Sequence, residues 1–162
     1  MAATHQASDK DNPGVIAPPP LIFIGVLLLA LAFDWLVSGP GFGLPYMGRM
    51  VAGGVLCLGG LALILAAGKR FSDAGTYIQT RKPSTALVTT GIYRYSRNPI
   101  YLGMTLIYVG LSLFADSVLA LAWLPLALII MYNGVIRREE RYLERKFGED
   151  YRAYRGRVRR WV

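Results

Sequence analysis

The sequence predicts an all-α protein that crosses a membrane four times and continues into amphipathic helices on the cytoplasmic side. Apolar residues make up 54% of its 162 residues, and the mean hydropathy is +0.37. These residues gather in four stretches, each close to the roughly 20 residues that a membrane-spanning helix needs. The membrane interior offers no hydrogen-bond partners, so each stretch has to pair its backbone groups internally, as a helix does.

The first predicted span covers residues 21–37 and carries a single charge, Asp34, near its end. A signal peptide is the competing interpretation of this run. The residues before it disfavour that interpretation, because they contain two Asp and only Lys10, with no clear cleavage pattern. We therefore expect residues 1–20 to form a disordered cytoplasmic leader and residues 21–162 to form one domain.

The second predicted span, residues 50–68, carries no charge and contains the pairs Gly53-Gly54 and Gly59-Gly60. Small residues let helix backbones approach closely in lipid, so this helix is expected to pack along a glycine face. The Gly- and Pro-rich segment 38–45 predicts a tight turn, which makes the first two spans antiparallel.

The third and fourth predicted spans cover residues 99–115 and 117–136, with almost no turn between them. Pro99 stands at a first-turn position, where proline is tolerated. Pro125 removes one backbone hydrogen bond from the fourth span and predicts a kink. The two spans therefore form an antiparallel hairpin.

Positive charge is concentrated in two segments, 69–98 and 137–162, whereas the turns at the other end of the spans carry none. The positive-inside rule places both basic segments, and with them both termini, in the cytoplasm. The resulting expectation is an integral membrane protein, in the inner membrane if its source is bacterial. Charge that flanks spans is explained by topology and anionic lipid, so we expect membrane lipids and no nucleic acid as partners.

The two basic segments are expected to form a cytoplasmic cap. Residues 76–78 and 86–88 favour short extended pieces, and apolar residues recur at helical spacing after residue 136, with one interruption at Gly148. One cysteine within a span and one histidine in the leader exclude an internal disulfide and make a metal site or a Cys/His nucleophile a poor explanation.

Two polar clusters are expected to meet at the cytoplasmic end of the hairpin, where the third span begins and the fourth span ends. One is the run 91–103, and the other is Arg138-Glu139-Glu140 at the end of the fourth span. Each cluster has an ordinary structural explanation, as interfacial anchors, an aromatic belt or surface ion pairs. Ionisable groups at membrane depth are nevertheless functional candidates by default.

These two motifs, in this order and one hairpin apart, resemble the isoprenylcysteine carboxyl methyltransferase and phospholipid methyltransferase superfamily. The resemblance covers residues 68–162 and includes Arg-Asn-Pro-Ile-Tyr-Leu-Gly at 97–103 and, after Glu140, Leu143, Phe147-Gly148, Tyr151 and Tyr154. It implies an S-adenosylmethionine-dependent methyltransferase with its cofactor at the cytoplasmic helix ends.

The resemblance also implies the site residues. Arg97 or Arg138 would pair with the cofactor carboxylate, and Glu140 or Glu139 would accept hydrogen bonds from the ribose or the ammonium group. Arg138 and Glu139 are the candidate catalytic residues. The candidate cofactor-binding residues are Tyr93, Arg97, Asn98, Tyr101, Gly103, Glu140 and Leu143.

Asn98 departs from the family pattern, since many relatives have histidine there. An amide does not titrate near neutral pH, so Asn98 does not shuttle protons. The sequence leaves the methyl acceptor open among an isoprenylcysteine-like carboxylate, a lipid amine and a thiol, each drawn from the bilayer. A membrane reductase of the sterol-reductase type and a non-catalytic membrane adaptor are the alternative functions.

Overall fold

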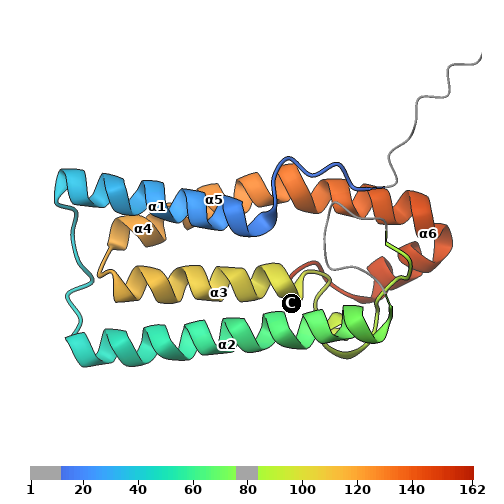
Figure 1. The fold of residues 1–162 in the computed structure, drawn as a ribbon, viewed down its shortest axis with the longest axis horizontal. Coiled ribbons are helices and arrows are strands. Elements are labelled where there is room, and N and C mark those ends of the chain that lie inside the picture. The colour runs from blue at the N-terminus through green and yellow to red at the C-terminus, as the bar shows by residue number, and fades with distance from the viewer. Residues whose placement is uncertain (1–11, 76–83) are drawn as a thin grey trace, which may run out of the picture.

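The computed structural model describes residues 12–75 and 84–162, and every regular element in this part of the chain is helical. The long helices lie side by side in a bundle (Figure 1). The elements are α1 (Pro19–Val37), α2 (Tyr46–Asp73), the 3₁₀-helix η1 (Gly91–Arg94), α3 (Pro99–Phe114), α4 (Val118–Ala122), α5 (Leu124–Met131), the π-helix η2 (Tyr132–Ile136) and α6 (Arg137–Arg157).

The helical class of the fold is confirmed, and three helical runs are long and apolar enough to cross a membrane. They are α1, α2 and the continuous run Val118–Arg157, of which the apolar part ends at Ile136. The third predicted span, residues 99–115, corresponds to α3, which is apolar but has only 16 residues. Helix α2 is longer at both ends than the predicted 50–68, and α1 begins at Pro19, inside the predicted leader.

Helices α2 and α3 pack with their backbones in contact along a glycine seam. A Cβ atom built on Gly60 would lie 2.5 Å from the carbonyl oxygen of Gly103, and one built on Gly103 would lie 2.6 Å from that of Gly60. Gly110 and Gly53 repeat this contact further along the seam. Gly59, in contrast, faces open space. The predicted glycine face is therefore present through one member of each glycine pair.

Arg49 and Asp116 join the two turns at one end of the bundle, which we call the turn end (residues 38–45 and 115–117). The guanidinium of Arg49 lies 3.3 Å from the Asp116 carboxylate and donates to the Leu113 carbonyl. The backbone N–H of Phe42 donates to the other Asp116 oxygen at 2.8 Å. Arg49 lies just outside the predicted span, and its charge is balanced locally.

The run from α4 to α6 is interrupted where the sequence predicted a kink. Helix α4 ends at Ala122, and α5 begins again at Leu124 with Pro125 in its first turn. Tyr108 of α3 donates a hydrogen bond to the Ala120 carbonyl, which fixes α4 against the hairpin partner. The N-terminal segment joins this run as well, because the Ile16 N–H donates to the Gly134 carbonyl in η2.

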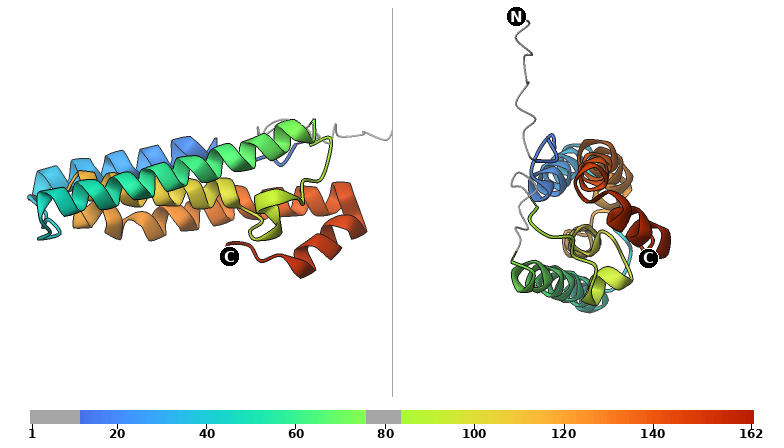
Figure 2. Two further views of the ribbon diagram at one scale, coloured as in Figure 1. Left: turned by 90° about the horizontal axis from the view of Figure 1, so that it is seen from below. Right: turned by 90° about the vertical axis from the view of Figure 1, so that its right-hand side faces the viewer.

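The other end of the bundle, which we call the basic end, is closed by residues 84–98 and by α6. Gly148 interrupts α6 with φ 53° and ψ −120°, and the chain folds back there toward the start of α3 (Figure 2). The Arg97 N–H then donates to the Arg159 carbonyl at 3.0 Å. Residues 86–88, predicted as extended, have no strand partner in the described chain, and residues 76–78 lie outside the described residues.

Candidate functional site

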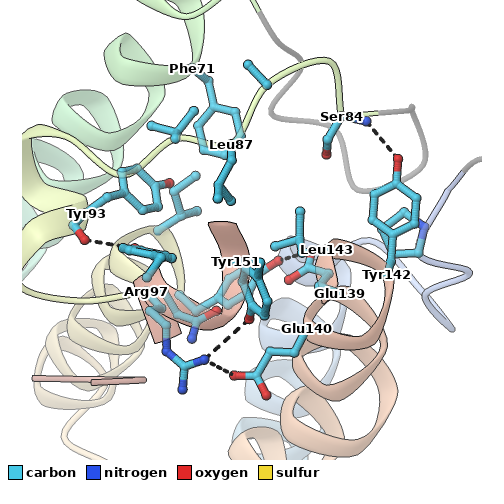
Figure 3. Close-up of a pocket in the computed structure, with 17 residues that line it drawn as sticks. Phe71, Ser84, Leu87, Tyr93, Arg97, Glu139, Glu140, Tyr142, Leu143 and Tyr151 are labelled. Carbon is cyan, nitrogen blue, oxygen red and sulfur yellow. Dashed lines mark hydrogen bonds and ion pairs between the residues drawn. The ribbon is translucent and has the colours of Figure 1, made fainter. Parts of the chain in front are cut away.

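A cavity lies at the basic end, between the start of α3, the first turns of α6, η1 and the loop that precedes η1 (Figure 3). Residues far apart in the sequence line it, because the α3–α4–α5 hairpin brings both of its ends together and α6 folds back over them. The lining residues are Pro13, Phe71, Ser84, Ala86, Leu87, Val88, Tyr93, Arg97, Asn98, Ile100, Tyr101, Glu139, Glu140, Tyr142, Leu143, Tyr151 and Tyr154.

Glu140 is held by two arginines. Arg160 binds both of its carboxylate oxygens at 2.9 Å, in the two-pronged geometry that gives strong pairs. Arg97 lies 3.2 Å from the same carboxylate and also donates to the Tyr151 hydroxyl at 3.3 Å, as Figure 3 shows. The Nε of Arg97 is buried and has no hydrogen-bond partner among the described residues. The network therefore has one more cation than anion and an unused donor.

Glu139 has a different environment from its neighbour. Its carboxylate accepts one hydrogen bond, from the Tyr101 hydroxyl at 2.6 Å, and forms no ion pair within the described chain. Burial raises the pKa of Glu139 from its ordinary 4.5 to about 7, and the nearby Glu140 acts in the same direction. The Tyr101 hydrogen bond opposes this shift. Glu139 can therefore gain or lose a proton near neutral pH.

Aromatic side chains form much of the remaining wall. Tyr154 donates to the Tyr93 carbonyl at 2.8 Å, and the Tyr142 hydroxyl accepts from the Ser84 N–H at 3.0 Å. The rings of Phe71 and Tyr93 meet edge to face with centroids 5.5 Å apart. Burial raises the pKa of Tyr93 and of Tyr154, so both hydroxyls stay protonated. The cavity thus combines flat apolar surfaces with a few fixed polar groups, as small-molecule sites commonly do.

Asn98 connects the start of α3 with the returning C-terminal segment. Its side-chain amide donates to the Arg160 carbonyl at 3.0 Å, and its backbone N–H donates to the Ser96 hydroxyl at 3.1 Å. The Ser96 hydroxyl makes a longer bond of 3.4 Å to the same Arg160 carbonyl. Asn98 therefore positions residue 160, whose side chain binds Glu140.

The cavity brings together most of the residues that the sequence singled out. Those in its wall are Tyr93, Arg97, Asn98, Tyr101, Glu139, Glu140 and Leu143. Gly103 lies elsewhere, in the seam with α2. Arg138 lines a separate pocket on another face of α6, where it donates to the Gly14 carbonyl at 2.7 Å.

Sequence reasoning missed Arg160. Its segment, Arg157-Val158-Arg159-Arg160, is indistinguishable by composition from the other basic stretches that flank the spans. The contribution of Phe71 was also missed, because it depends on α2 extending beyond residue 68. Tyr151 and Tyr154 belong to the apolar residues that recur at helical spacing after residue 136. This recurrence was the available signal that they face the rest of the protein.

Comparison with known proteins gives a family and several relatives. The sequence profile described as phospholipid methyltransferase matches residues 48–150. The nickel-cobalt-cadmium resistance protein NccN of Alcaligenes xylosoxydans xylosoxydans is 33% identical over 151 residues, which cover 85% of this chain and 66% of that protein. No solved structure matches.

Two yeast enzymes match the chain over a shorter part. The protein-S-isoprenylcysteine O-methyltransferase of Schizosaccharomyces pombe is 32% identical over 108 residues, which cover 65% of this chain and 45% of the enzyme. That of Saccharomyces cerevisiae is 36% identical over 93 residues, which cover 57% of this chain and 38% of the enzyme. The chain thus spans two thirds or less of the length of these relatives.

Proposed function

The chain belongs to the phospholipid methyltransferase family, and from this we propose that it is an S-adenosylmethionine-dependent methyltransferase whose active site is the cavity at the basic end. The observation that carries the proposal is the Arg97–Glu140–Arg160 network, of which Arg97 and Glu140 line an aromatic cavity. The family profile covers the residues of this cavity from Phe71 to Glu140 and beyond, up to residue 150.

The residues of the cavity fit the chemical groups of the cofactor. The unused Nε donor of Arg97 suits the carboxylate, and the Glu140 carboxylate suits the ribose hydroxyls or the ammonium group. Tyr93, Tyr101 and Leu143 offer flat or apolar surfaces for the adenine. When bound, the cofactor supplies a methyl group activated by a sulfonium cation. The protein has to orient the acceptor and exclude water, and these two effects carry much of the rate in such a displacement.

We assign the catalytic role to Glu139. Its carboxyl group lies in the cavity wall beside Tyr101, with a pKa of about 7. If the acceptor is an amine or a thiol, a proton has to leave it, and Glu139 is placed to accept that proton. If the acceptor is a carboxylate, no base is needed. Arg138 receives no catalytic role in this proposal, because it faces a different pocket.

We propose four spans, in which α3 is added to the three long helical runs, and an acceptor that enters from the bilayer. Helix α3 is about 24 Å long, shorter than the hydrocarbon thickness of about 30 Å, but it lies within the bundle between α2 and the α1–α5 side. The basic end is assigned to the cytoplasm, because it carries nearly all of the positive charge. Both termini then lie in the cytoplasm.

Cofactor binding by the purified protein in detergent tests the proposal. Calorimetry is expected to detect S-adenosylmethionine binding by the wild type. Glu140→Gln and Arg97→Ala are each expected to weaken binding by roughly tenfold or more, since each removes a charged hydrogen-bond partner. Arg155→Ala is the matched control, because Arg155 pairs with Glu144 at the surface. Absence of binding in the wild type, or equal affinity in all variants, would contradict the proposed site.

Transfer of the methyl group identifies the acceptor. Membranes that contain the protein are incubated with methyl-labelled cofactor, and the labelled lipid, thiol or protein is identified by mass spectrometry. Label in an endogenous lipophilic molecule is the expected result, and it should depend on Glu139 if the labelled molecule is an amine or a thiol. Binding of a nicotinamide cofactor in place of S-adenosylmethionine would instead favour a reductase, and binding of neither would favour an adaptor.

A further inference from the structure

A second pocket lies on the face of α6 that does not line the cavity. Its wall is formed by three arginines, at positions 138, 141 and 145, together with Glu144 and the N-terminal residues 12–14. The spacing of three and four residues places the arginines on one side of the helix. Pro13 lines both pockets, so the two are neighbours. This second pocket is not used by the proposed methyl transfer.

The three arginines have no acidic partner in the described part of the chain. Arg138 donates to the Gly14 carbonyl, and Arg141 donates to the Arg137 carbonyl. Glu144 does not balance them, because Arg152 and Arg155 already contact its carboxylate. The pocket thus keeps a positive charge that its own wall does not neutralise.

Arg138 also carries an unused donor. Its Nε is buried and has no hydrogen-bond partner among the described residues, although the guanidinium is held in place through Gly14. A buried N–H without an acceptor costs free energy unless a bound group supplies one. An anion in the pocket would supply an acceptor to Arg138 and counter-charge to Arg141 and Arg145.

The position of the pocket indicates where such an anion comes from. The apolar run ends at Ile136, so Arg138 and Arg141 lie within about 8 Å of its end along the helix, which is the depth of lipid headgroups. Helical side chains lean toward the N-terminus of their helix, so Arg145 leans back toward the membrane. Arginine binds phosphate oxygens in a fork geometry.

We propose that this pocket binds a phosphate group, of the kind presented by the headgroup of an anionic membrane lipid. The site is separate from the methyltransferase cavity, and the proposal does not depend on the activity assigned there. A lipid held in this way would fix the N-terminal segment against α6 through Arg138 and Gly14.

Competition between lipids tests the site. The full-length protein is purified in a neutral detergent and equilibrated with equal amounts of phosphatidylglycerol and phosphatidylcholine, and bound lipid is counted by native mass spectrometry. Phosphatidylcholine carries the same phosphate, but its choline neutralises the charge. The wild type is expected to prefer phosphatidylglycerol, and Arg141→Gln/Arg145→Gln is expected to reduce that preference roughly tenfold.

The matched control removes the same charge from another part of the basic end. Lys69→Gln/Arg94→Gln alters two exposed cations on α2 and η1, away from the pocket, and is expected to keep the preference. No preference in the wild type, or an equal loss in both double variants, would overturn the proposal. Elution volume and thermal unfolding check the fold. If the double variant does not fold, Arg145→Gln alone is used, since Arg145 has no hydrogen-bond partner in the described chain.

Inorganic phosphate separates the two sources of this chemistry. Displacement of phosphatidylglycerol from the wild type by millimolar phosphate would support a pocket that also accepts the soluble anion. If the wild type retains the lipid and Arg141→Gln/Arg145→Gln loses the preference for phosphatidylglycerol, the pocket needs the acyl chains as well. Phosphate that displaces lipid equally from the wild type and from this double variant would contradict the pocket, because the displaced lipid would then be bound elsewhere.

Discussion

Glu139 and Glu140 are neighbours in sequence but have opposite electrostatic surroundings. Two arginines hold the Glu140 carboxylate, whereas among the described residues Glu139 has only the Tyr101 hydroxyl as a partner. The closeness of Tyr101 to Glu139 was predictable, since a helical hairpin with a short turn must bring its ends together. The division of roles was not predictable, because it depends on Arg160, which reaches Glu140 only after the chain turns at Gly148.

The raised pKa of Glu139 predicts a loss of stability as the pH rises. Between pH 4.5 and about 7 the folded protein keeps a proton that the unfolded chain releases, so the free energy of unfolding falls across this range. The loss is expected to reach up to about 3 kcal/mol. Thermal unfolding in detergent at pH 5 and pH 8 should show it for the wild type and not for Glu139→Gln. Glu144→Gln, at the surface, should keep the wild-type slope, and a wild-type slope in Glu139→Gln would reject this assignment.

At the scale of elements, the contact between α2 and α3 depends on which glycine faces which helix. Gly60 lies against the Gly103 backbone, whereas Gly59 faces open space. The sequence predicted a glycine face but not its partner, because the pairs Gly53-Gly54 and Gly59-Gly60 present small residues on more than one side of α2. Gly103, which the family motif suggested for the cofactor, contacts the Gly60 backbone and is not among the residues that line the cavity.

Alanine substitutions at these two adjacent glycines are therefore expected to have opposite effects. Gly60→Ala forces the two backbones apart and should destabilise the protein by about 1–3 kcal/mol. The Cβ atom of Gly59→Ala meets no atom of the described residues, so this variant should be neutral or stabilising, because alanine favours a helix over glycine. Unfolding of both variants in the same detergent provides the comparison. A similar loss of stability at both positions would mean that α2 packs differently.

At the scale of the whole molecule, charge is divided between the two ends of the bundle. Arg49 lies in α2 beside the turn end, but Asp116 pairs with it, so this end has little net charge to oppose its translocation. The distribution of basic residues alone predicted this division. The pairing could not be predicted, because Arg49 and Asp116 are far apart in the sequence and meet only when α2 and α3 lie antiparallel.

The proposed orientation can be tested with single cysteines in a Cys57→Ser background. Leu44 lies exposed in the turn end, and Gly156 lies exposed near the end of α6. A thiol reagent that does not cross membranes should label Leu44→Cys in intact cells. It should label Gly156→Cys only after the cells are permeabilised. The reverse pattern would show that the basic end faces outward.

The return of residues 159 and 160 to the start of α3 also affects when the cavity can form. A ribosome makes the chain from its N-terminus, and α1, α2 and α3 can enter the membrane before residue 160 exists. Ser96, Arg97 and Asn98 then lack the carbonyl groups that they bind in the finished protein, and Glu140 lacks Arg160. The cavity is thus completed only after synthesis has passed residue 160, so a nascent chain that ends before this residue lacks the contacts that close the cavity.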